Sequence, residues 1–252
     1  MDPSGKVAIV TGGGTGLGRE MSLKLSSAGA RVAVNYPGAD EEEARATAAE
    51  IGASGGEALA VRADVAVADQ VDAMVEEVVG KFGGVDILLS NAGTTVFVPF
   101  DDLDGLDEAD WDRVFAVNAK ALFLLARAVV PHMKRRGAGV IVATTSGAAF
   151  KPIGSSIPYC ASKAALEMVT KCLAKSLGPE IRVNSLVPGG MITRWSAGFG
   201  DELRRKQAEA LPLKRHPNVA EVAEGAMLAI RNESLTGSSI LIDSGGSLIA
   251  NP

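Results

Sequence analysis

Seven short apolar runs recur along the chain, and longer amphipathic stretches separate them. The runs are rich in valine, isoleucine and leucine and do not alternate with polar residues, which is typical of strands buried on both faces of a parallel sheet. We therefore predict about seven strands, at residues 7–10, 32–34, 59–61, 87–89, 140–142, 183–187 and 240–242.

Helical patterns follow each of these runs except the last. Strands that alternate with helices imply right-handed crossovers and helices on both faces of the sheet. The pattern predicts an α/β fold, a doubly wound parallel sheet of the Rossmann type. No linker, repeat or low-complexity tract divides residues 1–252, so we expect a single domain. The predicted helices cover about residues 18–28, 41–51, 67–82, 108–135, 159–177 and 219–232.

Composition narrows the range of partners. Hydrophobic residues make up 47% of the chain and the net charge is -5, which gives no general attraction to nucleic acid or to an anionic membrane. The basic run Lys134-Arg135-Arg136 precedes Gly137, where a helix is expected to end, and cations favoured by the helix dipole explain it. No apolar run approaches the ~20 residues of a membrane span. We expect neither a nucleic-acid nor a membrane partner.

The cysteines and histidines indicate no disulfide and no metal. Cys160 and Cys172 share one predicted helix at a distance too great to bridge, as expected in a reducing compartment. His132 and His216 lack metal-ligand spacing. The first residues lead straight into a strand and leave no room for a signal peptide, so we expect a cytoplasmic protein without a bound metal.

A glycine-rich turn lies between the first predicted strand and the first predicted helix. It reads Thr11-Gly12-Gly13-Gly14-Thr15-Gly16-Leu17-Gly18. Glycines tolerate positive φ and let backbone amides approach a pyrophosphate, and the helix N-terminus adds a favourable dipole. The position of the turn favours a dinucleotide site over a simple tight connection.

The end of the second strand decides between the two nicotinamide cofactors. An acidic residue there would hold an unphosphorylated ribose, whereas a basic one would accommodate a 2′-phosphate. The strand ends at Asn35-Tyr36-Pro37 and offers neither, and Thr15 stands in the turn where a base could also help. Arg19 could reach a 2′-phosphate instead. Asp40–Glu43 could repel a phosphate, but an N-cap with acids in the first helical turn also explains them. The missing carboxylate favours NADP(H); NAD(H) or dual use stays open.

Tyr159 and Lys163 lie four residues apart on a helix entered at Pro158, so their side chains share one face. A neighbouring cation favours the phenolate anion and would bring the pKa of the phenol closer to working pH. The pair is weak evidence alone, because this spacing also arises by chance. Ser146 precedes Tyr159 in the order Ser-x12-Tyr-x3-Lys, and together with the glycine turn the three residues predict a hydride-transfer enzyme.

With these motifs in place, the chain resembles the short-chain dehydrogenase/reductase family, in its compact single-domain branch. The resemblance covers nearly the full length. The motifs that carry it are Thr11-Gly12-x3-Gly16-x-Gly18, Asp64-Val65, Asn91-Ala92-Gly93, Asn118, Ser146, Tyr159-x3-Lys163, Pro188-Gly189 with Thr193, and Asp243-Ser244-Gly245-Gly246. Two positions depart from the pattern: Ser90 replaces an asparagine common before Asn91, and Ala143-Thr144-Thr145 replaces an asparagine and an extra serine before Ser146.

The resemblance implies four catalytic residues. Tyr159 would give a proton to a carbonyl oxygen as hydride arrives, or take it from an alcohol in reverse. Lys163 would hold the nicotinamide ribose and bias the phenol toward its anion. Ser146 would hydrogen-bond the substrate oxygen, and Asn118 would fix a water that links Lys163 to solvent.

The resemblance also implies a set of cofactor contacts. Asp64 would approach the adenine, Asn91 and Gly93 would support the sheet beside the adenosine, and the loop after Pro188 would hold the carboxamide. For Asn91 a purely structural role is an equal alternative, and Asp243 is expected to be structural. The full predicted set is Gly12, Gly14, Thr15, Gly16, Leu17, Gly18, Asn35, Tyr36, Asp64, Val65, Asn91, Ala92, Gly93, Tyr159, Lys163, Pro188, Gly189, Met191 and Thr193.

The loops expected to line the pocket are largely apolar and favour an aliphatic, alicyclic or aromatic ketone or its secondary alcohol. Residues 190–215 are expected to form a lid over the substrate. A 3-oxoacyl-carrier-protein reductase is the alternative within the enzymes, and a non-catalytic nucleotide-sensing or scaffold protein is the alternative outside them. The resemblance further implies a homotetramer. The expected lining residues are Val96, Phe97, Phe100, Ala148, Phe150, Ile153, Met191, Trp195 and Phe199.

Overall fold

One parallel sheet of seven strands forms the centre of the computed structural model, which describes residues 1–194 and 200–249. The strand order is β3-β2-β1-β4-β5-β6-β7, and every neighbouring pair is parallel. This confirms the predicted doubly wound sheet. The strands are β1 (Val7–Val10), β2 (Arg31–Tyr36), β3 (Ala58–Arg62), β4 (Ile87–Ser90), β5 (Gly139–Thr144), β6 (Ile181–Pro188) and β7 (Ser239–Ile242).

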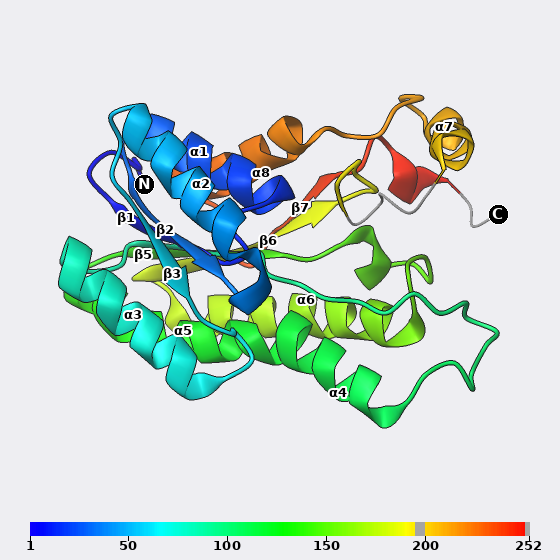
Figure 1. The fold of residues 1–252 in the computed structure, drawn as a ribbon, viewed down its shortest axis with the longest axis horizontal. Coiled ribbons are helices and arrows are strands. Elements are labelled where there is room, and N and C mark those ends of the chain that lie inside the picture. Colours follow the sequence, from blue (N-terminus) through cyan, green and yellow to red (C-terminus); the bar gives the residue numbers. More distant parts are fainter. Residues whose placement is uncertain (195–199, 250–252) are drawn as a thin grey trace.

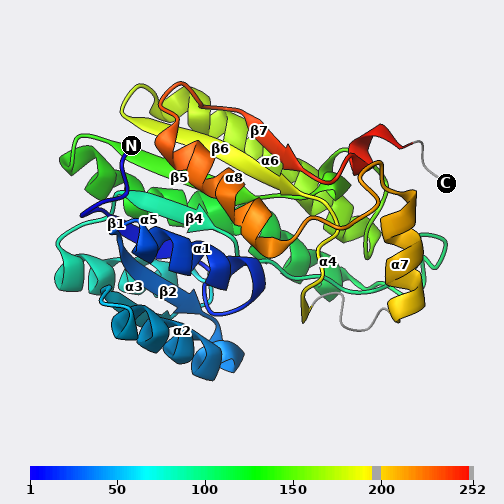
Figure 2. The ribbon, with the colours of Figure 1, turned by 90° about the horizontal axis from the view of Figure 1, so that it is seen from above.

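Helices cover both faces of the sheet, as predicted (Figure 1). One face carries α1, α2 and α8, and the other carries α3, α4, α5 and α6. Figure 2 shows α7 apart from both layers, beyond one end of the sheet. The helices are α1 (Gly16–Ser27), α2 (Glu41–Ala53), α3 (Ala68–Phe82), α4 (Glu108–Phe115), α5 (Ala121–Arg135), α6 (Ile157–Leu177), α7 (Asp201–Ala210) and α8 (Val219–Arg231).

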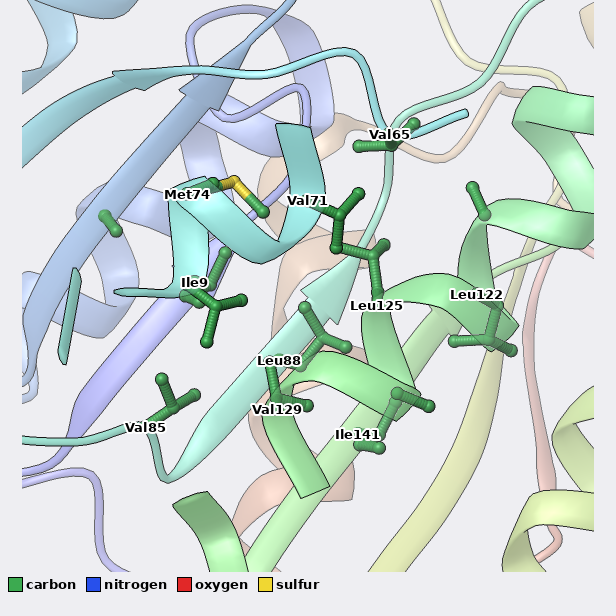
Figure 3. Close-up of a cluster of buried hydrophobic side chains, with 14 of the residues drawn as sticks. Ile9, Val65, Val71, Met74, Val85, Leu88, Leu122, Leu125, Val129 and Ile141 are labelled. Carbon is green, nitrogen blue, oxygen red and sulfur yellow. The ribbon is translucent and has the colours of Figure 1, made fainter. Parts of the chain in front are cut away.

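The sheet separates two apolar cores because successive strand residues point to opposite faces. In β1, Ile9 packs into the core beneath α3 and α5, whereas Ala8 and Val10 pack into the core beneath α1, α2 and α8. Figure 3 shows the first core, in which Leu88 and Ile141 of the sheet lie close to side chains from α3 and α5. Burial on both faces explains why the strands read as continuous apolar runs.

The helix predicted for residues 108–135 is interrupted by a single π-helical turn, η2 (Ala116–Lys120). Within the described residues, Glu108–Arg135 is also the one helix whose length and apolar composition would suffice to cross a membrane. This property was not predicted from the sequence. Of the helix's most apolar stretch of 18 residues, 56% is buried inside the fold. A core helix passes the same test, so this is weak evidence for a membrane span.

The end of α5 accounts for the basic run at residues 134–136. Arg135 lies 2.7 Å from the Nδ1 atom of His132, and Arg136 forms an ion pair of 2.6 Å with the buried Asp86. Two of the three cations are therefore held by neighbours in the fold, which supports the helix-end interpretation.

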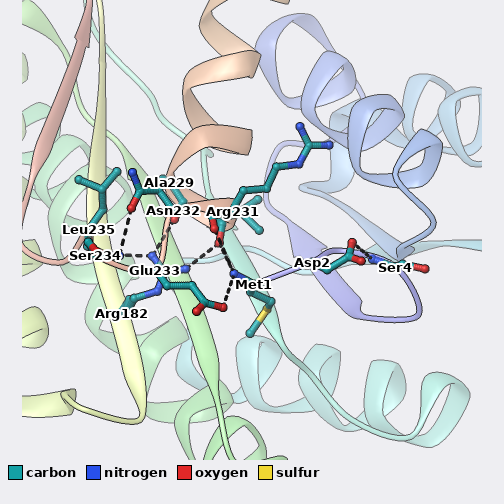
Figure 4. A network of polar contacts seen from close by, with 11 residues as sticks. Met1, Asp2, Ser4, Arg182, Ala229, Arg231, Asn232, Glu233, Ser234 and Leu235 are labelled. Atoms are coloured by element: carbon teal, nitrogen blue, oxygen red, sulfur yellow. Dashed lines mark hydrogen bonds and ion pairs between the residues drawn. The ribbon is translucent and has the colours of Figure 1, made fainter.

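The amino ends of the strands lie together at one edge of the sheet (Figure 1). There the Arg182 guanidinium donates hydrogen bonds to the carbonyls of Ala229, Ile230 and Leu235, at 2.6–3.0 Å, and caps α8 (Figure 4). The motifs that carry chemistry lie at the opposite edge, where the strands end and where α7 and the loop between β4 and α4 project (Figure 1).

Candidate active site

The glycine turn after β1 forms a tight cradle at the start of α1. A Cβ added to Gly18 would lie 2.0 Å from the Gly12 carbonyl oxygen, and one added to Gly14 would lie 2.7 Å from the Ala44 amide nitrogen. Gly12 and Gly16 have φ values of +60° and +50°. The backbone thus lies bare at a helix N-terminus, the arrangement that binds phosphate groups.

Asn91 braces the strand ends beside this turn. Its backbone amide donates to the Thr11 hydroxyl at 2.9 Å, and its side-chain amide donates to the Thr11 carbonyl at 3.1 Å. Thr144, at the end of β5, donates to the Asn91 Oδ1 atom at 3.3 Å. The side chain therefore ties β1, β4 and β5 together, which favours the structural alternative for Asn91. Ala92 contributes by donating its backbone amide to the same Thr11 hydroxyl at 3.0 Å.

Ser146, Tyr159 and Lys163 come together at the carboxyl ends of β5 and its neighbours. α6 begins at Ile157, where the Ser156 hydroxyl accepts a hydrogen bond from the Tyr159 amide. The Ser146 hydroxyl is hydrogen-bonded to the Tyr159 phenol. Lys163 Nζ donates to the Thr144 carbonyl at 2.9 Å and lies 5.8 Å from the centre of the Tyr159 ring.

Burial dominates the electrostatics of this pair. It raises the pKa of Tyr159, and the hydrogen bond with Ser146 offsets only part of that rise. Burial also lowers the pKa of Lys163 to about 8. The expectation that a neighbouring cation lowers the pKa of the phenol is therefore wrong for the protein alone. The same burial that desolvates the phenol also weakens the cation that was expected to act on it.

The pH dependence of stability should report the buried lysine. Lys163 has a pKa of about 8 when folded and 10.5 when exposed, so the unfolded chain binds the proton more readily between these values. Burial of the protonated Lys163 destabilises the folded state fully below pH 8, and this destabilisation is lost as the pH rises toward 10.5. We expect the stability of Lys163→Met relative to wild type to fall by about 2–3 kcal/mol between pH 7 and pH 10. Urea unfolding of both proteins measures this, and an unchanged difference would contradict it.

Asn118 lies in the π turn and holds three segments together. Its Oδ1 atom accepts from the Thr94 amide at 2.8 Å, and its Nδ2 atom donates to the Thr94 carbonyl at 2.9 Å and to Ser162 Oγ at 3.0 Å. The loop after β4 is thus fixed to α6 between Tyr159 and Lys163. π turns are frequent at functional sites because the extra residue shifts a side chain out of the regular helical pattern.

The end of β2 differs from expectation at Asn35. Its side chain is fully buried and donates to the carbonyls of Val61 and Ala63 in and after β3. The side chain therefore faces the sheet, and only the backbone of Asn35 could meet a cofactor; its carbonyl accepts from the Gly13 amide and steadies the glycine turn. Tyr36 is also buried, at 4% exposure.

Arg62 supplies a cation beside the end of β2, and it is not among the cofactor contacts predicted from the sequence. Its Nη2 atom lies 3.1 Å from the point where a Cβ would stand on Gly38, just beyond β2. β3 pairs with β2 so that Arg62 lies opposite Tyr36, which places both at the carboxyl ends of their strands. No ion pair involves Arg62 within residues 1–194 and 200–249. The sequence could have indicated Arg62, because neighbouring parallel strands bring the end of β3 beside the end of β2.

Asp64 lies beyond β3 as expected, but its carboxylate already has partners. It accepts from the Ala66 amide at 2.9 Å and forms an ion pair of 2.9 Å with Arg113 of α4. Burial acts to raise the pKa of Asp64, and the Ala66 hydrogen bond and Arg113 outweigh it and lower the pKa. Val65 is buried in the core, so only its backbone could meet a cofactor.

The segment after β6 passes over the glycine turn. Gly189 packs so closely on Asp243 that an added Cβ would lie 2.7 Å from its Cα atom, and Thr193 lies near Gly16. Arg194 then forms an ion pair of 2.8 Å with Asp40, at the start of α2. This segment therefore runs beside the glycine turn and reaches the start of α2.

Two anchors hold the predicted lid. At its start, Asp243 accepts hydrogen bonds from the Gly245 and Ser247 amides, which confirms its structural role and fixes the surface on which Gly189 rests. At its end, the two ring nitrogens of His216 lie 2.9 Å from the Gly190 carbonyl and 3.1 Å from the Arg204 carbonyl. Trp195 and Phe199, predicted to line the pocket, lie outside the described residues.

This edge of the sheet therefore combines a bare glycine turn with a serine, a tyrosine and a lysine at adjoining strand ends. A family model described as short chain dehydrogenase matches residues 6–203. The chain belongs to the short-chain dehydrogenase/reductase family. It is an oxidoreductase of that family, which uses NAD(P)(H).

Relatives in this family act on different substrates. The chain is 36% identical over 245 residues to 3-oxoacyl-acyl-carrier-protein reductase FabG of Staphylococcus epidermidis, covering 95% of this chain and 98% of the relative. A solved 7α-hydroxysteroid dehydrogenase, complexed with NADH and 7-oxo glycochenodeoxycholic acid, superposes with a TM-score of 0.90 at 31% identity, covering 98% of this chain and 96% of that one. A short-chain type dehydrogenase/reductase from Mycobacterium marinum gives 0.89 at 34%, with 97% and 96% coverage.

The residues expected to line the pocket are apolar, and those within the described ranges differ in exposure. Phe97, Phe150 and Ile153 are exposed to 60%, 57% and 44%, whereas Ala148 is buried. Val96, Phe100 and Met191 are partly exposed. Exposed phenylalanines on the loops after β4 and β5 provide a surface for an apolar substrate.

Proposed function

We propose that this protein interconverts a ketone and a secondary alcohol by hydride transfer, with Tyr159 as the proton donor. The observation that carries the proposal is the convergence of Ser146, Tyr159 and Lys163 at strand ends beside the glycine cradle. A dinucleotide fits this edge of the sheet because the glycine turn leaves backbone amides bare at the N-terminus of α1. When bound, the nicotinamide supplies or accepts the hydride.

Each side chain has a task that suits its surroundings. Because burial raises the pKa of Tyr159, the phenol keeps its proton at neutral pH and can donate it to the substrate oxygen. Ser146 hydrogen-bonds the same oxygen, where negative charge develops. Lys163, with a pKa near 8, holds the ribose hydroxyls and can pass a proton toward the phenol. The water relay at Asn118 remains a prediction, supported by its place between the β4 loop and α6.

NADP(H) is the cofactor we favour. A 2′-phosphate at the end of β2 would meet Arg62, while Asp40, which precedes α2, is already paired with Arg194 at 2.8 Å. Glu41 is paired with Arg45. The acids that seemed to oppose a phosphate are thus largely neutralised by their own partners. The comparison structure with NADH leaves NAD(H) use as the alternative.

Arg62→Gln tests the cofactor preference. Removing the guanidinium should weaken NADPH binding about tenfold, since a hydrogen bond to a charged group contributes roughly 1.5 kcal/mol. NADH binding should change less than about twofold, because it has no phosphate at that position. Fluorescence titration of both nucleotides measures the two constants. Arg127→Gln, an exposed arginine of α5 paired with Asp72, is the control; an equal loss there would indicate a general charge effect.

The test of the reaction is nucleotide oxidation against a mixed panel. NADPH and NADH are each incubated with aliphatic, alicyclic and aromatic ketones and with a 3-oxoacyl thioester. Turnover of free ketones supports the proposal. Turnover of the thioester alone would favour the second candidate, a 3-oxoacyl-carrier-protein reductase, which rests on the 36% identity to the Staphylococcus epidermidis reductase. Tight nucleotide binding with no turnover would favour a non-catalytic protein.

We further propose that residues 190–215 close over the substrate and that the protein is a homotetramer. The Arg194–Asp40 ion pair and the His216 contacts support a closing segment. Exposed apolar side chains on α6 and at the C-terminal end, Met168 at 60% and Leu248 at 82%, support association. Light scattering at micromolar concentration should give four times the chain mass, and a monomeric mass would contradict the tetramer.

A further inference from the structure

A carboxylate on α6 is buried without a cation and is not used by the proposed reaction. Glu167 is 5% exposed and forms no ion pair within the described residues. Its Oε1 atom accepts from the Thr145 hydroxyl at 2.6 Å, and its Oε2 atom accepts from Ser185 at 3.0 Å and Ser239 at 2.8 Å. Three hydroxyls from β6, β7 and the end of β5 thus converge on one charged group.

Stability alone does not require this arrangement. Taking a carboxylate out of water is costly, and apolar side chains of similar volume often pack as well or better. Three hydroxyl donors compensate the charge, but each must then be held in one orientation. What the cluster supplies is a fixed spatial relation between α6 and the strands β5, β6 and β7.

The position of the cluster explains why that relation matters. Tyr159, Lys163 and Glu167 recur every four residues and share one face of α6. Lys163 Nζ contacts the carbonyl of Thr144, and Glu167 accepts from the side chain of the next residue, Thr145. The residue after that is Ser146. Two successive contacts therefore attach the tyrosine-bearing helix to the strand end immediately before the serine.

We propose that Glu167 is a positioning residue for the reaction: through Thr145 it sets the distance between the Ser146 hydroxyl and the Tyr159 phenol. The Thr145 amide also donates to the Leu186 carbonyl at 2.8 Å, so the threonine is held from both its backbone and its side chain. Release of the side chain would leave Ser146 attached to the sheet by one contact fewer. The kinetic test of this proposal rests on the proposed function. The structural test, a distance between two side chains, rests on geometry alone.

Four variants and one control test the proposal kinetically. Glu167→Met and Thr145→Val should each lower kcat about 10- to 100-fold, the effect of a small misplacement of catalytic groups. Cofactor Kd should stay within about twofold, because the phosphate cradle lies on α1. If Glu167 acts through Thr145, the double variant should be no slower than the slower single one. Additive losses would overturn the proposal.

Glu167→Gln is the conservative variant. Its amide oxygen can accept from Thr145, and its two N–H groups can donate to Ser185 and Ser239, so kcat should stay within about threefold of wild type. Thr170→Val is the matched control. This threonine is buried on the same helix, but its hydroxyl bonds the Leu166 carbonyl within α6 and no strand. A loss of kcat in Thr170→Val equal to that in Glu167→Met would show a general weakening of the helix and overturn the proposal.

A structural readout separates this proposal from the proposed function. Crystal structures of wild type, Glu167→Met and Thr145→Val give the distance from Ser146 Oγ to Tyr159 Oη whether or not a substrate is known. A lengthening of about 0.5 Å or more in both variants supports the positioning role, because catalytic geometry is held to about that tolerance. An unchanged distance overturns it, even if turnover of ketones has been established.

Discussion

Replacing Tyr159 with phenylalanine is expected to lower turnover about 10³- to 10⁴-fold, the contribution typical of a positioned general acid. Only the hydroxyl is removed, so the ring still packs against Gly154, whose added Cβ would lie 3.2 Å from Tyr159 Cδ1. Nucleotide affinity should change less than about threefold, since the cradle for the phosphates is untouched. Oxidation of NADPH or NADH with the best ketone of the panel measures the loss.

Cys160→Ala is the control for this variant. Cys160 is the next residue on α6 and donates from Sγ to the Ile153 carbonyl, but consecutive helical residues point in different directions. Its turnover should stay within about tenfold of wild type, because it offers no proton to the substrate. Activity of Tyr159→Phe within tenfold of wild type would refute the assignment of the proton donor.

Gly18→Ala is expected to abolish useful cofactor binding. The added Cβ would lie 2.0 Å from the Gly12 carbonyl oxygen and 2.7 Å from Asn91 Nδ2, so the glycine turn or the end of β4 must shift. Such overpacking costs roughly 1–3 kcal/mol of stability. Because the shift moves the amides that would meet the pyrophosphate, dinucleotide affinity should fall about 100-fold. Calorimetric titration and thermal unfolding measure the two effects.

Gly80→Ala is the matched control for the glycine turn. Gly80 lies in α3, and an added Cβ there meets nothing within 4 Å. The change should raise stability by about 0.5–1 kcal/mol, since alanine favours the helix, and leave dinucleotide binding unaltered. Wild-type affinity in Gly18→Ala would show that the turn does not hold the phosphates.

The sequence was sufficient for the order and type of the main elements. The apolar runs were continuous because both faces of the sheet are buried, and the helices that separate them left one plausible topology. The start of α8 was predicted at residue 219, where Asn218 forms a capping box, whereas α6 begins at Ile157, two residues before the expected start, because the Ser156 hydroxyl caps it. α1 begins at Gly16, two residues before the expected start, because the glycine turn itself winds into the helix.

The parts that sequence could not supply depend on contacts between distant segments. The π turn at Ala116–Lys120 has no local signature, since its residues suit an ordinary helix. Asn35 was expected to contact the cofactor, but pairing of β2 with β3 buries its side chain. The direction of the pKa of Tyr159 follows from how deeply α6 is packed, which spacing alone does not reveal. The Arg113–Asp64 ion pair joins residues 49 positions apart.

The segment between β6 and α8 is anchored apart from the residues that are assigned to proton transfer. The residues assigned to proton transfer all precede β6, whereas this segment is fastened at Gly189 on Asp243 and by His216 on Gly190 and Arg204. When a loop is held at its two ends, the residues between them can be replaced without disturbing the scaffold. The fold is therefore modular in the sense useful to enzyme engineering: we expect that grafting another relative's segment between these anchors, with Met191 and Thr193 kept as the predicted cofactor contacts, alters which substrate is accepted and leaves the reaction intact.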